Sequence, residues 1–380
     1  MYAPMENKMR DVLAKRTGLI DASGIRKVFA LAASLKDPVN LSIGQPDFDV
    51  PDPIKAAAIE AIRAGENKYS QTTGTLELLD ALGERVKSQY GWADSQILVT
   101  NGVSGGLLLA FMALVDEGDE VIMADPYFVM YKHLVNMLGG KCVFIDTYPD
   151  FKLSPERIAQ AVTERTKLIL LNSPANPTGA VYSEQEVKAV AKVAADNDII
   201  VLSDEIYDTF CYDGPPASIA RYYDKTLLMS GFSKAYAMTG WRMGSVAVKE
   251  PLANVLEQMI KIQQYTFVCT PIPFQKAAIV ALDTDMSEYV AAYKKKRDMV
   301  HDGLKDKFEM VRPGGAFYTF VKAPESAKSA TEFVKKAIEN NVLIIPGNVF
   351  SERDTHFRIS YATSDEKIAE GIDILCRLAD

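Results

Sequence analysis

The sequence predicts an α/β protein: a large domain with a mostly parallel central sheet flanked by helices, plus a smaller α+β domain. Between about residues 75 and 250 of the 380-residue chain, short apolar runs alternate with amphipathic helical stretches, as in strands joined by crossover helices. Several of these runs are nearly continuous Val, Ile and Leu, which is typical of strands buried on both faces. After about residue 285, a long polar stretch and separate strand-like and helical segments indicate the second domain.

Seven strands are predicted in the large domain, at Ile97–Thr100, Glu120–Ala124, Cys142–Ile145, Leu168–Leu171, Ile199–Ser203, Thr226–Met229 and Gly244–Val248. Helix signals lie between these strands. Ser183 followed by Glu186 forms a capping box, which predicts a helix running to Asp196. Gly91 is placed to end a helix over Thr75–Tyr90 in the left-handed conformation.

The smaller domain is predicted to contain helices and strands over Met286–Lys307, Ala316–Val321, Thr331–Asn340, His356–Tyr361 and from Ser364 onward. We therefore expect three parts: residues 1–45 as an N-terminal segment packed with the small domain, 46–285 as the large domain and 286–380 as the small domain. The sequence contains no repeat and no flexible linker, so the two domains are expected to pack closely.

Composition and charge argue against several kinds of protein. The chain has 42 basic and 50 acidic residues, a net charge of −8, and no basic block suited to nucleic acid. The uncharged stretch Ser95–Val115 approaches the length of a membrane span, but its central polar and glycine residues predict strand, turn and helix instead. The four cysteines and three histidines are widely spaced, so we expect free thiols, no metal site and a cytoplasmic location.

A glycine-rich turn at residues 102–106 follows the first predicted strand. Its sequence GVSGG fits the G-x-S-x-G pattern of a serine hydrolase, with Ser104 as nucleophile and His301 or His356 as the base. The same turn exposes backbone N–H groups at the start of a helix, which is a favourable place for an anion. We favour the anion site and keep the hydrolase as a distant alternative.

Four polar residues follow strands of the predicted sheet: Ser104, Asn176 in NSPANPTG, Asp204 at the end of IIVLSD, and Lys234. The carboxyl ends of parallel strands lie at one edge of a sheet, so these loops are expected to meet there. The neighbours of Lys234 are small or aromatic and would bury it. Burial lowers the pKa of a lysine, as a Schiff-base lysine requires.

The segment GFSKAYAMTGWRMG, residues 231–244, resembles the lysine-attachment signature of the fold-type I, class I/II aminotransferases of the aspartate aminotransferase superfamily. The resemblance runs from IGQPDFDVP (43–51) to FRISYA (357–362), with NPTG and D-x-x-Y in the expected order. It implies a pyridoxal 5′-phosphate enzyme that exchanges the amino group between an L-amino acid and a 2-oxo acid by a ping-pong Schiff-base mechanism. Glutamate and 2-oxoglutarate are the expected common pair. The resemblance also implies a homodimer with active sites at the subunit interface.

The same resemblance implies roles for individual residues. The catalytic residues would be Lys234, which forms the Schiff base and moves a proton, Asp204, which pairs with the pyridine nitrogen, and Tyr207. The other cofactor contacts would come from Asn176 and Tyr207 at the phenolic oxygen, Phe128 on the ring, Arg242, Val103 and Ser104 at the phosphate, and Tyr69 from the neighbouring subunit. The substrate carboxylate would contact Arg358, Gly44 and Asn176.

Two positions depart from the family pattern. Gly231 stands where many members have a phosphate-binding serine, and Ser230 or Ser233 are the possible replacements. Ser104 stands where some aspartate-specific members have a lysine that binds the distal carboxylate. We therefore expect a broad or neutral-to-aromatic range of amino donors. Three further tyrosines are candidate pocket residues: Tyr131, Tyr236 and Tyr265.

Two further alternatives stay open. One, within the same fold, is a β-eliminating carbon–sulfur lyase. The other is of a different class, a cofactor-sensing transcription regulator, which is disfavoured because the resemblance begins near residue 40 and leaves no room for a DNA-binding domain.

Overall fold

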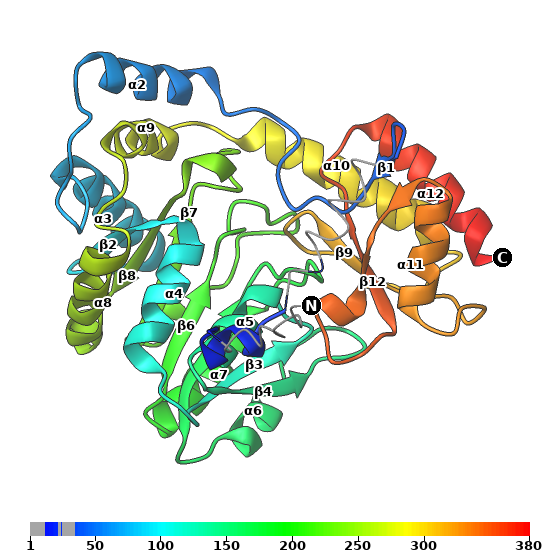
Figure 1. Cartoon of the computed structure of the whole chain (residues 1–380), viewed down its shortest axis with the longest axis horizontal. Coiled ribbons are helices and arrows are strands. Elements are labelled where there is room, and N and C mark those ends of the chain that lie inside the picture. The colour runs from blue at the N-terminus through cyan, green and yellow to red at the C-terminus, as the bar shows by residue number, and fades with distance from the viewer. Residues whose placement is uncertain (1–11, 22–23, 25–34) are drawn as a thin grey trace, which may run out of the picture.

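The computed structural model of the chain describes residues 12–21, 24 and 35–380. Figure 1 shows the large domain on the left, with its sheet and covering helices, and the smaller domain on the right, with the C-terminus. Much of the predicted N-terminal segment, at 1–11, 22–23 and 25–34, lies outside the described residues. Within the rest of it, β1 (Val39–Asn40) pairs in parallel with β10 (Val342–Leu343) of the smaller domain. The domain boundaries at residues 45 and 285 remain a prediction, which this pairing supports.

The central sheet has seven strands in the order β2-β8-β7-β6-β5-β3-β4, and each overlaps one of the predicted strands. Strands β7, β6, β5, β3 and β4 are parallel to one another, whereas β8 is antiparallel to both β7 and β2. As a result β2 runs in the same direction as β7, and the two end at the same edge. The strands span β2 (Gln96–Asn101), β3 (Glu120–Asp125), β4 (Lys141–Asp146), β5 (Thr166–Asn172), β6 (Ile200–Asp204), β7 (Thr226–Gly231) and β8 (Met243–Val248).

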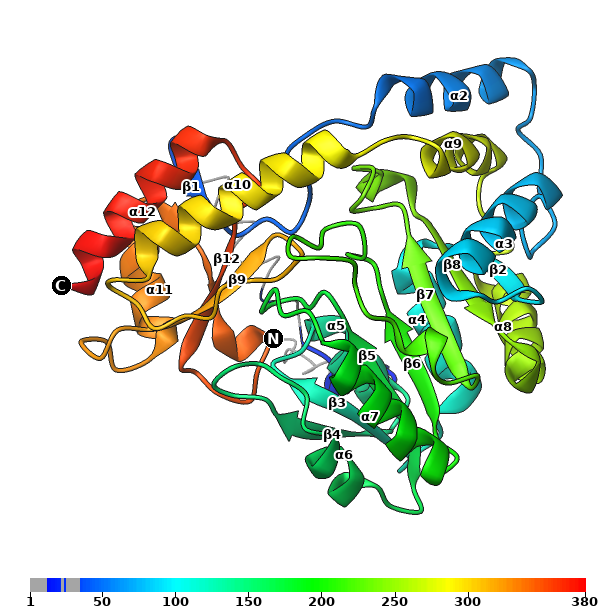
Figure 2. The ribbon, with the colours of Figure 1, turned by 180° about the vertical axis from the view of Figure 1, so that it is seen from behind.

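Helices cover both faces of this sheet, as predicted. On one face lie α4 (Gly102–Leu114), α5 (Val129–Met137) and α8 (Ala253–Thr266). On the other lie α6 (Pro155–Ala161) and α7 (Glu184–Asp196), which cross in front of the strands in Figure 2. Burial alternates accordingly: Ile122 packs in one cluster with Val190 of α7, whereas the adjacent Val121 belongs to the cluster of Leu107 on α4. The period of two places these side chains on opposite faces.

The structure confirms two helix ends that were predicted for the large domain. Both bonds of the Ser183–Glu186 capping box are present at the start of α7. Helix α3 (Leu76–Tyr90) ends at Gly91, whose φ of 77° is the left-handed conformation that glycine adopts without strain. A third packing group joins α3 to α2 (Asp52–Arg63) and α9 (Ile272–Leu282) beside the sheet.

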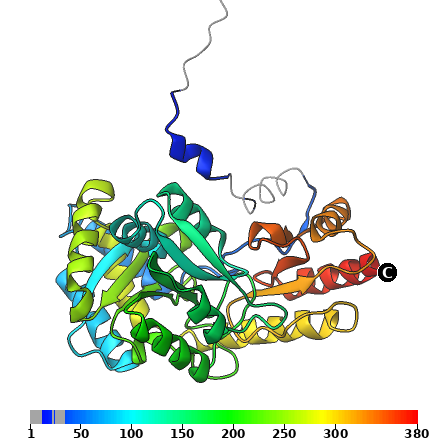
Figure 3. The ribbon, with the colours of Figure 1, turned by 90° about the horizontal axis from the view of Figure 1, so that it is seen from below.

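The smaller domain has a three-stranded antiparallel sheet in the order β11-β12-β9. Its strands are β9 (Tyr318–Lys322), β11 (Ile345–Pro346) and β12 (His356–Ser360), and its helices are α10 (Ser287–Leu304), α11 (Ala330–Glu339) and α12 (Asp365–Ala379). Helices α10 and α12 lie side by side in Figure 3. Short 3-10 turns complete the chain: η1 (Lys15–Leu19), η2 (Ile219–Arg221), η3 (Thr239–Trp241), η4 (Glu250–Leu252) and η5 (Gly347–Val349).

Within the described residues, no helix combines the length and the apolar character needed to cross a membrane. The same part of the chain contains no group of three or more histidine, cysteine or acidic residues arranged to hold a metal ion. The four cysteines are all unpaired.

Candidate active site

A cavity of about 670 Å³ lies where the loops after the central strands face the smaller domain. This volume is in the range of small-molecule sites. The predicted site residues that line it are Gly44, Val103, Ser104, Phe128, Asn176, Asp204, Tyr207, Lys234, Arg242 and Arg358. Tyr69 does not line it, and its side chain is 83% exposed. The structure therefore brings together every predicted site residue except Tyr69, while their individual roles remain predictions.

Lys234 lies in the loop after β7, with its side chain in the cavity. Its Nζ donates a hydrogen bond to the carbonyl oxygen of Gly44 at 2.6 Å and lies 5.8 Å from the ring centre of Tyr207. Burial, reinforced by the nearby Arg358 and Arg242 cations, lowers the pKa of Lys234 to about 8. A substantial fraction of this amine is therefore neutral near pH 8, and a neutral amine is the form that attacks a carbonyl.

Asp204 ends β6 and is buried at the base of the cavity. Its Oδ2 accepts a hydrogen bond from the Tyr131 hydroxyl at 2.7 Å, and its Oδ1 accepts one from the Ile206 N–H at 3.2 Å. Burial raises the pKa of Asp204 to about 6, although these hydrogen bonds and Lys234 oppose the rise. A buried carboxylate with so few partners is suited to a cationic group in the cavity.

Arg358 lies on β12, the middle strand of the small sheet, and reaches across to the large domain. Its Nη1 donates to Asn176 Oδ1 at 3.0 Å and its Nη2 to the Ser42 carbonyl at 2.7 Å. The guanidinium packs on the rings of Tyr318 and Phe350, 4.5 and 4.6 Å from their centres. Its buried Nε has no hydrogen-bond partner among the described residues. The fixed fork thus keeps a free N–H for a carboxylate, and the Asn176 amide nitrogen stays available as a donor.

The start of α4 forms an anion site. No side chain caps this helix, so the N–H groups of Val103 and Ser104 are free within its first turn. A Cβ on Gly102, which has a φ of +68°, would lie 2.6 Å from Arg242 Nη2, so the guanidinium sits directly against the helix start. Arg242 Nη1 is held by the Thr239 carbonyl at 2.8 Å. A cation and a helix N-terminus together suit a phosphate.

Gly231 is closely packed on its side-chain face. A Cβ there would lie 2.7 Å from Ile206 Cδ1 and 2.9 Å from Val103 Cγ2, so a serine would require these two side chains to shift. Of the two possible replacements, Ser233 lines the main cavity, whereas Ser230 lines a separate small void. Ser233 is therefore the one of these two serines that shares a cavity with the anion site.

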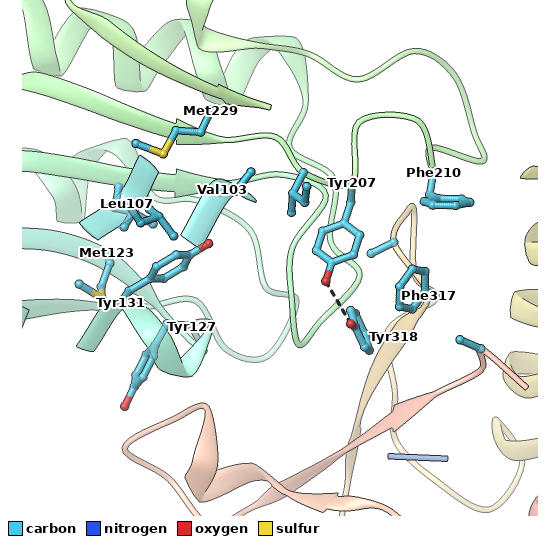
Figure 4. Packing of buried hydrophobic residues seen from close by; sticks show 14 of the residues in the cluster. Val103, Leu107, Met123, Tyr127, Tyr131, Tyr207, Phe210, Met229, Phe317 and Tyr318 are labelled. Carbon is cyan, nitrogen blue, oxygen red and sulfur yellow. Dashed lines mark hydrogen bonds between the residues drawn. The ribbon is translucent and has the colours of Figure 1, made fainter. Parts of the chain in front are cut away.

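Several site residues were not foreseen. Figure 4 shows Tyr318 of β9 pointing at Tyr207, and their hydroxyl oxygens are 3.0 Å apart. Tyr131 was expected only as a possible pocket residue, but it bonds Asp204 directly. Tyr236 faces the small void, and Tyr265 is 87% exposed. Tyr318 is one of 17 tyrosines, and no motif or spacing in the sequence distinguishes it.

The two histidines expected to serve a hydrolase lie outside the cavity that Ser104 lines. His356 stacks on Phe320, and burial lowers its pKa to about 4. His301 lies on α10 beside Asp302. Neither is placed to activate Ser104.

Residues 36–375 match the family model "Aminotransferase class I and II". The chain belongs to this family. This aminotransferase is 40% identical over 373 residues to the "Probable aspartate aminotransferase" of Methanocaldococcus jannaschii, across 96% of this chain and 99% of that relative. It is 37% identical to the "Aromatic-amino-acid aminotransferase 2" of Thermococcus litoralis, across 95% and 96%. The solved aspartate aminotransferase of Thermus thermophilus with maleate matches with a TM-score of 0.93 at 34% identity, covering 97% of this chain and 100% of the other.

The aminotransferases of this family depend on pyridoxal phosphate, and the cavity has the donor set that this cofactor needs. The helix start with Arg242 fits its phosphate, and the buried Asp204 fits a protonated ring nitrogen. Lys234, with its lowered pKa, fits the aldehyde. The residues present therefore fit the cofactor at each of its three polar ends.

Proposed function

We propose that this aminotransferase binds pyridoxal phosphate in the main cavity and exchanges an amino group between an L-amino acid and a 2-oxo acid, with glutamate and 2-oxoglutarate as one pair. The observation that supports this most is the buried Lys234 amine in one cavity with Asp204 and Arg358. When bound, the cofactor supplies an electron sink for the bonds of the substrate α-carbon.

Each of the other steps is proposed for a particular side chain of the cavity. Lys234 would take the proton from the substrate α-carbon and return it to the carbon on the other side of the transferred nitrogen, because its amine lines the cavity and its pKa is lowered to about 8. Asp204, held by Tyr131, would keep the ring nitrogen of the cofactor protonated. The Asn176 amide and the Tyr207 hydroxyl would donate to the phenolic oxygen of the cofactor. Arg358 orients the substrate by its α-carboxylate.

The donor range is proposed to be broad or neutral to aromatic. Ser104 and its neighbours Gly105, Gly106 and Leu107 offer no cation to a distal carboxylate, and an unpaired carboxylate in a closed site is costly.

Scanning amino donors against 2-oxoglutarate, oxaloacetate and pyruvate tests the proposal. Transfer of a ¹⁵N label to the oxo acid is expected, whereas release of labelled ammonia would identify the lyase.

We further propose a cytoplasmic homodimer with active sites at the subunit interface. Large apolar side chains are exposed on α2 (Ile62), in the loop that follows it (Tyr69), at the start of α3 (Leu76) and on α8 (Tyr265). Exposed apolar side chains of this size support a role for these elements in an interface. The location rests on the unpaired cysteines. Sedimentation of the wild-type chain beside Tyr69→Ser tests the dimer and the contribution of Tyr69.

Replacing Asp204 by Asn is expected to lower kcat about 100-fold. This is the effect of lowering the pKa of the cofactor's ring nitrogen by about two, which corresponds to ~2.7 kcal/mol of lost stabilisation of its protonated form. Folding should be little affected, because the amide retains the shape and still accepts from Tyr131. The measurements are kcat at saturating donor and the urea midpoint. Asp198→Asn, at an exposed acid before β6, is the control. A kcat within about twofold of wild type would make Asp204 a structural residue only.

The rate at which the cofactor-free protein captures pyridoxal phosphate on Lys234 is expected to rise with pH and level off above about 8. Below this pH the amine is protonated and unreactive, and above it the amine is neutral. Stopped-flow absorbance between pH 6 and 10 measures this, with Nα-acetyl-lysine as the reference for the titration of the cofactor itself. A rise that continues to pH 10 would show an ordinary, solvated lysine.

A further inference from the structure

A second group of polar side chains lies behind the loops that carry Lys234 and Asp204. We call it the rear cluster: Arg85, Tyr90, Ser203, Glu205, Asp208, Ser218 and Tyr236. None of its members lines the main cavity. Most are buried, and the side chains of Arg85 and Asp208 are 24% and 13% exposed. The proposed roles of the cavity residues leave this whole cluster unexplained.

The two catalytic loops present alternate residues to the cavity and to the rear cluster. After β6, Asp204 and Tyr207 line the main cavity, whereas Asp208 lines the small void at the rear. In the next loop, Lys234 lines the main cavity and Tyr236 the void. The rear residues Asp208 and Tyr236 therefore lie only one and two positions along the chain from the cavity residues Tyr207 and Lys234.

Arg85 of α3 bridges these two loops. Its Nη1 donates to the Tyr236 hydroxyl oxygen at 3.2 Å, and its Nη2 donates to Asp208 Oδ2 at 3.2 Å. Its Nε donates to Gln89 at 3.4 Å on the same helix, which helps to fix the fork. Burial is the largest single influence on Arg85 and disfavours its charge, but Asp208, Tyr236 and Tyr90 together outweigh it and raise the pKa, so the guanidinium stays charged. A planar fork holds two partners at a fixed separation, which a lysine cannot do.

The remaining residues of the rear cluster are joined to one another by hydrogen bonds. Glu205 accepts hydrogen bonds from Ser203, Ser218 and Tyr90, and burial raises its pKa to about 7. The void beside Arg85 has a volume of about 20 Å³, which has room for about one water molecule. The rear cluster is therefore too small to be a second ligand site, and a mechanical role fits it better.

We propose that Arg85 is a positioning residue of this enzyme: by joining Tyr236 to Asp208 it holds the Lys234 loop in register with the Asp204–Tyr207 segment. The inference rests on the proposed function. It follows from the need to hold reacting groups closely, since a displacement of about 1 Å can cost about 100-fold in rate. Arg85 does not line the cavity, so it acts on the cavity residues through Tyr236 and Asp208.

Arg85→Leu is expected to lower kcat about 10- to 100-fold, while KM for the amino donor changes less than about threefold. The split arises because Arg358 and Asn176, which are proposed to bind the donor carboxylate, lie away from the rear cluster. Tyr236→Phe breaks one bond of the bridge and should have a smaller effect of the same kind. The double variant should match Arg85→Leu alone, because both changes break one link. Arg85→Lys should recover activity only in part.

The readout that separates positioning from stability is the titration of the Lys234 amine in the cofactor-free protein. Acetylation by acetic anhydride, mapped by mass spectrometry across pH, gives its midpoint. In Arg85→Leu a loosened loop admits water, so the titration midpoint of Lys234 should rise above pH 8. Each rise of one pH unit in this midpoint lowers the fraction of neutral, reactive amine about tenfold at pH values below it. The other groups that act on this amine, Asp204, Arg242 and Arg358, are unchanged in every variant.

Lys87→Leu, at an exposed lysine of the same helix, is the matched control and should leave the midpoint and kcat unchanged. A lower Tm of Arg85→Leu with an unchanged midpoint and kcat would overturn the proposal. If Arg85→Leu does not fold, Tyr236→Phe is the deciding variant. A raised midpoint together with a lower kcat would support the positioning role of Arg85. An unchanged midpoint and an unchanged kcat would refute it. A wild-type chain that does not capture pyridoxal phosphate would refute the proposed function, while the acetylation midpoints would still test Arg85.

Discussion

Lys234→Ala is expected to lower kcat by about 10⁴-fold or more. Two contributions disappear together: the covalent link to the cofactor, and the base that transfers the proton, which alone supplies about 10²- to 10⁴-fold. The fold should persist, because Lys234 makes one hydrogen bond, to the Gly44 carbonyl, and removing a buried amine relieves a desolvation cost. Steady-state kinetics with a saturating amino donor measure the loss.

Lys225→Ala is the control for this change. Lys225 immediately precedes β7, the strand that leads to the Lys234 loop, and its side chain pairs with Asp198 at the surface. Its replacement should leave kcat within about twofold, as surface ion pairs contribute little. Turnover of Lys234→Ala at a rate near that of Lys225→Ala would contradict the assignment of this lysine and of the cavity with it.

Arg358→Ala is expected to lower kcat/KM by about 30- to several-thousand-fold for every amino donor, the effect of about 2–5 kcal/mol when one partner of a buried charge pair is removed. The loss should be uniform because all donors share the α-carboxylate that this residue is proposed to bind. The ratios of kcat/KM among aspartate, alanine, methionine and phenylalanine should therefore hardly move.

The comparison variant is Arg353→Ala, a half-exposed arginine just before β12 that pairs with Asp146. It should leave kcat/KM nearly unchanged for all four donors. A loss in Arg358→Ala that is confined to aspartate and glutamate would show that Arg358 binds the side-chain carboxylate instead, and the orientation of the substrate in the cavity would have to be reversed.

The large-domain fold was predictable because burial on both faces gives each central strand a long apolar run. The run Leu168–Leu171 lies inside β5, and every other predicted strand differs from the observed one by at most two residues at an end. The polar residues that follow these runs were predictable for the same reason, since parallel strands place their following loops at one edge. The antiparallel direction of β8 was not predicted, because an apolar run has no direction.

Contacts made by single side chains from distant segments were not predictable. Tyr318 meets Tyr207 across 111 positions of sequence, and Arg85 meets Tyr236 across 151. Such pairs leave no periodicity or spacing in the chain, because each depends on how whole helices and sheets pack. The pairing of β1 with β10 has the same origin, since two-residue strands carry no pattern of their own.

The central claim is that pyridoxal phosphate is held in this cavity through Lys234. Borohydride reduction of the wild-type chain saturated with pyridoxal phosphate, followed by proteolysis and mass spectrometry, tests it most directly. The result expected is one modified peptide that contains Lys234 within GFSKAYAMTGWRMG, with no such modification in Lys234→Ala. Stoichiometric modification of a different lysine would contradict the claim, and so would the absence of any modified lysine.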